Sequence, residues 1–129
     1  MPETIEGVSH VSATELSEIL NNPEQRNIYV IDVREPEEYQ EAHIPGIPLL
    51  PMGEIPELID QFDKEAEYVL VCRSGRRSLE VSKYFQSEGI QKVHNYAGGM
   101  LAWNADVAEG PEHVITSFNM KNLERKSVK

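Results

Sequence analysis

The feature that most constrains this chain is a strand-like segment that ends at its only cysteine and leads into helical spacing. Tyr68-Val-Leu-Val-Cys72 is apolar throughout, which is typical of a strand buried on both faces of a parallel sheet. Residues 78–88 then carry apolar side chains at the spacing of one helix face, and Gly89 is a natural stop just past them. A strand, a short loop and a helix in this order are the repeating unit of an α/β fold.

Elements of both kinds alternate along most of the chain. Residues 28–33 and 92–96 are predicted strands, and the first of them is β-branched and nearly all apolar. One predicted helix begins at the capping box Ser12-Ala-Thr-Glu15, and two others cover residues 36–42 and 55–62. A short fourth helix follows Gly98-Gly99. The order predicts an α/β fold with a central parallel sheet that is flanked by helices on both faces.

The composition narrows the classes of partner. The chain has 129 residues, which suits one domain, and its formal net charge is −10, with 22 acidic residues against 12 Lys and Arg. Such a field repels nucleic acid and anionic membranes, so we expect neither as a partner. The apolar stretches are too short for a membrane helix, and Met1-Pro-Glu-Thr4 opens no basic-then-apolar leader, so we expect a cytoplasmic protein.

The cysteine and histidine content excludes two kinds of site. A single cysteine cannot form an intramolecular disulfide and offers no metal cage. His10, His94 and His113 lack the spacing of metal ligands. We therefore expect neither a metal nor a cofactor.

The loop Cys72-Arg-Ser-Gly-Arg-Arg-Ser78 is the best candidate for the chemistry. It lies where ligands bind in parallel sheets, at the carboxyl end of a strand, and it precedes a helix whose first N–H groups are unpaired. Gly75 allows the loop to curl, so that its N–H groups can form an anion nest. Such donors and the nearby arginines favour the thiolate, and we predict that Cys72 is a nucleophile.

The residues of this loop and three other stretches resemble one family. Cys72-Arg-Ser-Gly-x-Arg77-Ser78 is similar to the active-site loop of rhodanese-like domains. Asp32-Val-Arg-Glu-x-x-Glu-Tyr39, His43-Ile-Pro-Gly46 and Gly98-Gly99-Met-x-x-Trp103 agree with that family in order and spacing. The resemblance implies a single rhodanese-like domain, which we place at residues 8–108, followed by a loosely held C-terminal tail over 109–129.

The resemblance also implies a reaction. Cys72 would take a sulfane sulfur from a small anionic donor such as thiosulfate, hold it as a persulfide and pass it to an external acceptor: cyanide, a small thiol or a partner protein. The residues expected to bind the donor or the persulfide are Arg73, Ser74, Gly75, Arg76, Arg77 and Ser78. Among them, Arg73 and Arg76 are expected at the mouth of the loop, where they attract the donor. Ser78 is expected either as the helix cap or in the first turn of the helix.

Other polar residues of the motifs are better interpreted as scaffold. Asp32 and Arg34 follow a strand end, where an ion pair commonly holds a loop in place. His43 stands beside Ile-Pro-Gly, which favours a structural hydrogen bond over a general base. Trp103 is expected to be a core aromatic residue.

Two alternatives remain beside the sulfurtransferase. Small cysteine phosphatases and arsenate reductases use a similar cradle with five residues between cysteine and arginine. Here the sixth residue after Cys72 is Ser78, and the arginine stands one residue earlier, at Arg77. The loop therefore closes a smaller ring, which favours the terminal sulfur of a persulfide over a phosphate. The other alternative is a sulfur-delivery or binding module with little turnover of its own; the intact cysteine loop argues for activity.

Overall fold

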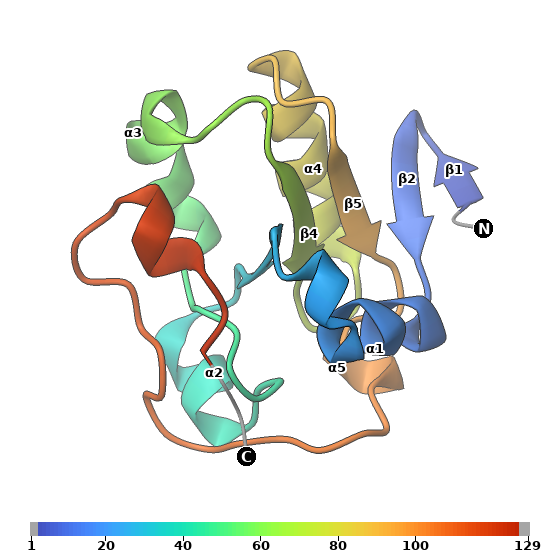
Figure 1. Ribbon diagram of the computed structural model, residues 1–129, viewed down its shortest axis with the longest axis vertical. Coiled ribbons are helices and arrows are strands. Elements are labelled where there is room, and N and C mark those ends of the chain that lie inside the picture. The colour runs from blue at the N-terminus through green and yellow to red at the C-terminus, as the bar shows by residue number, and fades with distance from the viewer. Residues whose placement is uncertain (1–2, 127–129) are drawn as a thin grey trace.

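The computed structural model describes residues 3–126, which contain one five-stranded sheet (Figure 1). The strands are β1 (Glu3–Ile5), β2 (Val8–Val11), β3 (Ile28–Asp32), β4 (Glu67–Val71) and β5 (Val93–Tyr96). Their spatial order is β1-β2-β5-β4-β3, and only the β1–β2 pair is antiparallel. The carboxyl ends of the four parallel strands therefore meet at one edge, where ligands bind in open sheets of this kind.

Helices cover both faces of this sheet, as the sequence predicts. Side chains along β4 alternate between the faces: Val69 packs in one core with helix α1 (Ala13–Asn21), and Leu70 packs in the other with helix α4 (Arg76–Ser87). Because Cys72 continues this alternation, it belongs to the core on the α4 side.

Three shorter helices complete the fold. Helix α2 (Pro36–Glu41) follows β3, and helix α5 (Gly99–Ala102) follows β5. Helix α3 (Ile55–Leu58) adds Ile55 to the core on the α4 side. Among residues 3–126, no helix combines the length and the apolar character needed to cross a bilayer.

The structure differs from the expected elements at three places. The β1–β2 hairpin was not predicted, because Ser9 and His10 interrupt the apolar pattern of β2. The predicted helix over 55–62 is α3 followed by a 3₁₀ turn at Ile59–Gln61. Helix α4 begins at Arg76 rather than at Ser78, since Gly75 is its N-cap.

The described part of the segment that we expected to be loosely held, residues 109–126, packs on the domain. Val114 forms a parallel bridge with Leu49, next to the end of β3. A 3₁₀ turn at Met120–Leu123 buries the Leu123 side chain completely in the core on the α4 side. The apolar residues of this segment are too few and too irregularly spaced to show periodicity. The domain boundary at residue 108 stays a prediction, and residues 127–129 lie outside the described part.

Candidate active site

The loop between β4 and α4 encloses the thiol. Gly75 has a φ of +90°, a left-handed conformation that favours glycine, and it turns the chain into α4. The Cys72 side chain is completely buried. Arg73, Ser74 and Arg76 are exposed. The loop therefore places charged and polar groups over a sulfur atom that solvent does not reach.

The sulfur of Cys72 is surrounded by hydrogen-bond donors. The N–H of Gly75 donates to Sγ at 3.0 Å, and the N–H of Ser78 donates to it at 3.4 Å. The Ser78 hydroxyl oxygen lies 3.2 Å from the same sulfur. Burial raises the pKa of the Cys72 thiol, but the hydrogen bonds from the Ser78 hydroxyl and from the N–H groups of Ser78, Ser74 and Gly75 outweigh it, so the pKa lies below its ordinary value. The geometry thus favours an anionic sulfur.

The turn between β5 and α5 is hydrogen-bonded to the backbone of this loop. The N–H of Met100 donates to the carbonyl oxygen of Cys72 at 2.9 Å, and the N–H of Leu101 donates to that of Arg73 at 3.0 Å. Gly99, with a φ of +60°, approaches so closely that a Cβ there would lie 2.3 Å from the Arg73 carbonyl oxygen. The Gly98-Gly99 motif therefore sets the backbone of the cysteine loop.

Asn95 is a buried residue of the site that the sequence analysis missed. It lies in β5 and is 1% exposed. Its Nδ2 donates to the carbonyl oxygen of Gly75 at 3.0 Å, and its Oδ1 accepts a short hydrogen bond from the Ser78 hydroxyl. The available signal was a lone amide at a core position of a predicted strand, between Val93 and Tyr96.

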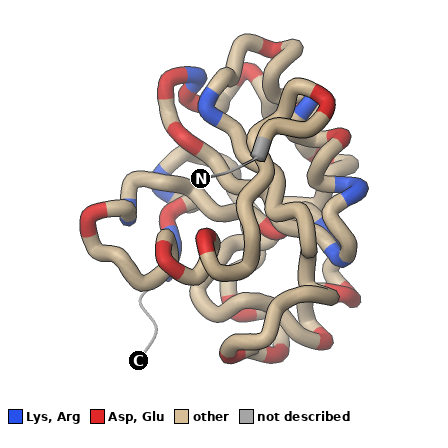
Figure 2. The backbone as a smooth tube through the Cα atoms, turned by 90° about the vertical axis from the view of Figure 1, so that its right-hand side faces the viewer, with Lys and Arg blue, Asp and Glu red and all other residues tan. Residues whose placement is uncertain are grey.

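The three loop arginines have different surroundings. Arg77 forms a two-pronged ion pair with Glu38 of α2, with N–O distances of 2.7 and 2.8 Å. This contact with Arg77 lowers the pKa of Glu38 to about 2. Arg73 and Arg76 are exposed, and among the described residues neither has a carboxylate within ion-pair distance. Acidic positions are spread over the whole molecule (Figure 2), so these two free cations stand out locally.

Asp32 and Arg34 form a buried ion pair. The Nε and NH2 groups of Arg34 donate to the Asp32 carboxylate at 2.8–3.0 Å, and NH2 also donates to the carbonyl oxygen of Ala42 at 2.7 Å. Burial raises the pKa of Asp32, and the hydrogen bonds from Arg34 oppose that rise. The pair ties the end of β3 to the end of α2, and no hydrogen bond from either side chain reaches Cys72 among the described residues.

His43 is equally committed to the scaffold by its contacts. Its ring is completely buried and stacks on Tyr39 at 3.7 Å between centroids. Nδ1 lies 2.9 Å from the Tyr39 carbonyl oxygen, and Nε2 lies 2.9 Å from Oε1 of Glu112. The Nδ1 contact joins His43 to α2, and the Nε2 contact joins it to the C-terminal segment, so both ring nitrogens are occupied.

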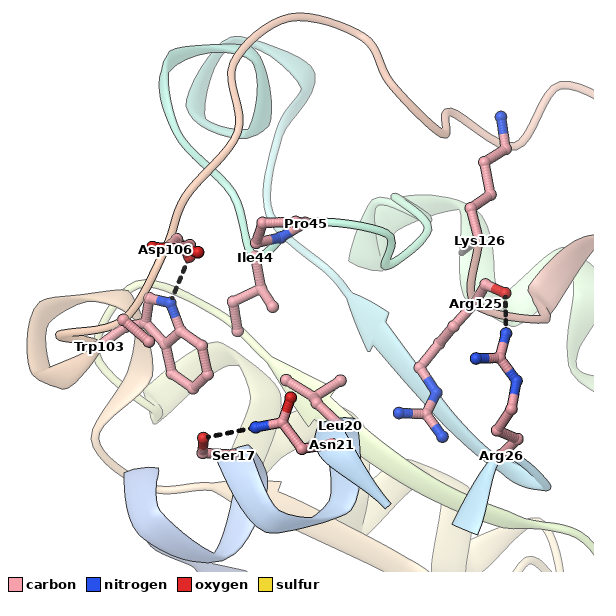
Figure 3. Close-up of a pocket in the computed structure, with 11 residues that line it drawn as sticks. Ser17, Leu20, Asn21, Arg26, Ile44, Pro45, Trp103, Asp106, Arg125 and Lys126 are labelled. Atoms are coloured by element: carbon pink, nitrogen blue, oxygen red, sulfur yellow. Dashed lines mark hydrogen bonds between the residues drawn. The ribbon is translucent and has the colours of Figure 1, made fainter. Parts of the chain in front are cut away.

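A pocket of about 380 Å³ lies away from the thiol, beside α1 (Figure 3). Trp103, expected to be a core aromatic residue, is partly buried against the core on the α1 side and also forms part of the pocket wall. Its ring packs edge-on against Tyr96, and Nε1 donates to the carbonyl oxygen of Asp106. Arg26 and Arg125 form the opposite side, where the guanidinium of Arg125 donates to the carbonyl oxygens of Ile19 and Gln25. Cys72 does not line this pocket.

The described residues include no group of three or more His, Cys, Asp or Glu side chains that could hold a metal ion. Two acidic side chains near the loop, Glu38 and Asp32, are instead engaged in ion pairs. What the site offers chemically is one thiol in a ring of donors.

The chain is similar in sequence and in fold to several known proteins. The rhodanese-like domain profile matches residues 12–106. The Bacillus subtilis protein YtwF, provisionally named a sulfurtransferase, is 42% identical over 99 residues, which are 77% of this chain and 93% of that protein. The thiosulfate sulfurtransferase GlpE of Pseudoalteromonas translucida is 28% identical over 103 residues, covering 80% and 95% of the two chains. The crystal structure of a rhodanese-like domain protein from Staphylococcus aureus superposes with a TM-score of 0.67 at 32% identity, covering 78% and 96%.

Proposed function

This chain belongs to the rhodanese-like family of sulfurtransferases, and we propose that it transfers a sulfane sulfur from thiosulfate through a persulfide on Cys72. The observation that carries the proposal is the ring of donors around Sγ, formed by Gly75 and Ser78. Donors fixed around a sulfur atom stabilise it as an anion, which is the form in which a cysteine attacks.

The proposed reaction has two displacements. The Cys72 thiolate attacks the outer sulfur of thiosulfate, the S–S bond of the donor breaks, and its electron pair leaves with sulfite. The product is a persulfide anion whose terminal sulfur carries the charge. A nucleophilic acceptor such as cyanide then attacks that terminal sulfur, and the thiolate of Cys72 is regenerated as the leaving group. No oxidant or reductant is consumed.

Each loop residue has a proposed part in these steps. Arg73 and Arg76 attract the dianionic donor, since they are exposed and unpaired within the described residues. The N–H groups of Ser74, Gly75 and Ser78 stabilise the anionic sulfur. Arg77 acts by holding the loop to α2 through Glu38. Because the thiol is buried, the donor reaches it only when the exposed part of the loop moves aside.

The acceptor must come from outside the chain, because Cys72 is its only cysteine and no resolving thiol exists. A small thiol or a partner protein fits this requirement as well as cyanide does. We place the protein in the cytoplasm, where a reducing environment keeps a lone cysteine available as a thiol.

Intact mass spectrometry tests the proposal. The wild-type protein incubated with thiosulfate should gain the mass of one sulfur atom, and cyanide should remove it with release of thiocyanate. Cys72→Ala should gain nothing, whereas Ser87→Ala, at the exposed far end of α4, should behave like the wild type. A gain of sulfur that survives in Cys72→Ala would contradict the assignment. Hydrolysis of aryl phosphates by a wild type that forms no persulfide would favour the phosphatase alternative.

A further inference from the structure

The groups around Cys72 form a closed ring of hydrogen bonds. The sulfur contacts the Ser78 hydroxyl, that hydroxyl contacts Oδ1 of Asn95, and Nδ2 of Asn95 donates to the carbonyl oxygen of Gly75. The N–H of Gly75 donates to the sulfur, which closes the ring. Ser78 is completely buried and Asn95 nearly so, so no solvent is available to replace a missing partner.

The orientation of the Asn95 amide follows from its second contact. The Gly75 carbonyl oxygen can only accept, so the amide must present its N–H₂ group there at 3.0 Å. Its Oδ1 then faces the Ser78 hydroxyl and can only accept from it. Ser78 has a single hydroxyl hydrogen, and two acceptors can claim it: Oδ1 of Asn95 and an anionic sulfur.

The protonation state of Cys72 determines which acceptors compete for the hydroxyl hydrogen of Ser78. While Cys72 is a thiol, its S–H can donate to the Ser78 oxygen, and the hydroxyl hydrogen can remain on Asn95, so every group is satisfied. Once the sulfur is an anion, there is no S–H. The hydroxyl then either turns to the sulfur, which leaves Oδ1 buried without a donor, or stays on Asn95, which leaves the sulfur with backbone donors only.

We propose that Asn95 is a positioning residue that competes with the sulfur of Cys72 for the single hydroxyl hydrogen of Ser78, and so limits how strongly the loop stabilises a charged sulfur. A sulfur that is too well stabilised attacks poorly, because nucleophilicity falls as basicity falls. The competition therefore keeps the sulfur anionic and still reactive. The persulfide part of this inference rests on the proposed function, whereas the thiol and thiolate part does not.

The other charged groups near the ring are either ion-paired or exposed. Arg77 of α4 acts on the sulfur from a distance and is paired with Glu38 of α2. Arg73 and Arg76 lie on the exposed side of the loop. The charge of Asp32, after β3, is matched by Arg34.

His10 of β2 is the remaining titratable neighbour. It stands opposite Asn95 in the parallel register, it is 8% exposed, and neither ring nitrogen has a hydrogen-bond partner among the described residues. It makes no contact with the Ser78 hydroxyl that could supply a second donor. Asn95 is thus the group that competes for this hydrogen.

The test measures the rate of iodoacetamide alkylation of Cys72 against pH, with no sulfur donor present. Asn95→Leu keeps the branching at Cγ but removes the competing acceptor, so the hydroxyl should turn to the thiolate. The midpoint should fall by about one pH unit, a roughly tenfold gain in thiolate at pH values below it. A residue that only holds the loop would give the opposite sign, because its loss would loosen the donors around the sulfur.

Serine variants show whether the effect runs through Ser78. Adding Ser78→Ala to Asn95→Leu should cancel the fall, whereas Ser78→Ala alone should raise the midpoint by a smaller amount. Ser82→Ala is the matched control, since Ser82 is a buried serine of α4 whose hydroxyl donates to the Ser78 carbonyl oxygen. It should leave the midpoint unchanged. A midpoint that is unchanged or raised in folded Asn95→Leu would overturn the proposal.

A second measurement does not depend on whether the Asn95 variant folds. In the wild type, the ¹⁵N shift of the Asn95 side-chain amide should titrate with the same midpoint as the alkylation of Cys72. In Ser78→Ala this titration should disappear, because the hydroxyl that links the two groups is gone. An Asn95 amide signal that stays constant through the Cys72 midpoint in the wild type would also overturn the proposal. Since neither measurement involves sulfur transfer, failure of the proposed function would leave both results readable.

Discussion

Two glycines determine how closely the cysteine loop and the β5–α5 turn approach each other. A Cβ on Gly75 would lie 2.1 Å from the carbonyl oxygen of Ala97, and one on Gly99 would lie 2.3 Å from that of Arg73. Both contacts are with backbone, which cannot turn aside as a side chain can. The donors around Cys72 therefore keep their places only because two positions in different loops lack a side chain.

Gly75→Ala should cost more stability than its backbone conformation alone explains. Gly110→Ala is the matched control, because Gly110 has a φ of +83° but nothing within 4 Å of its Cβ position. Strain at positive φ should cost Gly110→Ala about 1–2 kcal/mol. Displacing the Ala97 carbonyl should cost Gly75→Ala a further 1–3 kcal/mol or so. Urea unfolding measures both, and equal losses in the two variants would show that the close approach is unimportant.

The exposed arginines should act through charge on the donor. Replacing Arg73 and Arg76 together by Gln should raise the KM for thiosulfate severalfold while changing kcat less, and high salt should act on the wild type in the same direction. The control is Lys64→Gln with Lys121→Gln, which removes the same charge from exposed positions outside the loop. Steady-state kinetics with thiosulfate and cyanide measure both parameters. An unchanged KM in the arginine variant would show that these side chains are only solvated.

At the scale of single residues, the sequence indicates the members of one contiguous loop. It does not indicate Asn95, which contacts that loop from β5. The spacing around Cys72 and Gly75 is local, so a motif shows it. Asn95 meets Ser78 only because β5 pairs with β4 and α4 packs over both. Such long-range contacts leave no periodic signal in the sequence.

At the scale of elements, the Arg77–Glu38 ion pair joins α4 to α2. The two side chains are 34% and 29% exposed, so water screens the pair, and its contribution is about 1 kcal/mol at most. Its value for the site is geometric, since it fixes the first turn of α4, which carries Ser78. Both residues belong to motifs that the sequence shows, but their pairing follows only from the packing of α2 against the loop.

The stability contributed by this pair should disappear in acid. Because Arg77 lowers the pKa of Glu38 from 4.5 to about 2, the folded state favours the carboxylate, and the contribution is present above pH 4.5 and lost as the pH falls toward 2. Glu38→Gln should therefore be less stable than the wild type by about 1 kcal/mol at pH 7, and by less at pH 3. Glu37→Gln, at an exposed neighbouring position, should show no such convergence. A gap that widens toward pH 3 in urea unfolding would contradict this sign.

The elements themselves were predictable where they are buried on both faces. Strands β3 and β4 have apolar runs that predict them, and the capping box of Ser12 and Glu15 is present at the start of α1. Strand β5 was also predicted, although His94 and Asn95 interrupt its apolar residues. The β1–β2 hairpin escaped because β1 is an edge strand of only three residues and β2 carries the polar residues Ser9 and His10. Parallel pairing with β5, rather than a local apolar pattern, defines β2 as a strand.

On the scale of the whole molecule, the C-terminal segment closes the fold. It pairs first with His43 and Leu49, then buries Leu123 in the core on the α4 side, and then reaches the end of α1 through Arg125. The sequence could not reveal this course, because each anchor is a single residue whose partner lies far away in the chain. Arg125 illustrates the point: its partners, the carbonyl oxygens of Ile19 and Gln25, are separated from it by about a hundred residues.

If this segment is part of the cooperative unit, one buried residue in it should govern the stability of the whole domain. Leu123 is completely buried, so Leu123→Ala should lower the free energy of unfolding by about 2–4 kcal/mol. Leu101→Ala is the matched control, because that leucine is 66% exposed, and it should change stability by less than about 0.5 kcal/mol. Trp103, the only tryptophan, packs with the core on the α1 side, whereas Leu123 lies on the other. Its fluorescence and far-ultraviolet circular dichroism should therefore shift to the same lower urea midpoint in Leu123→Ala. If the segment were only loosely attached, the substitution would leave both midpoints where they are in the wild type, since the strands and α1 would unfold without reference to it.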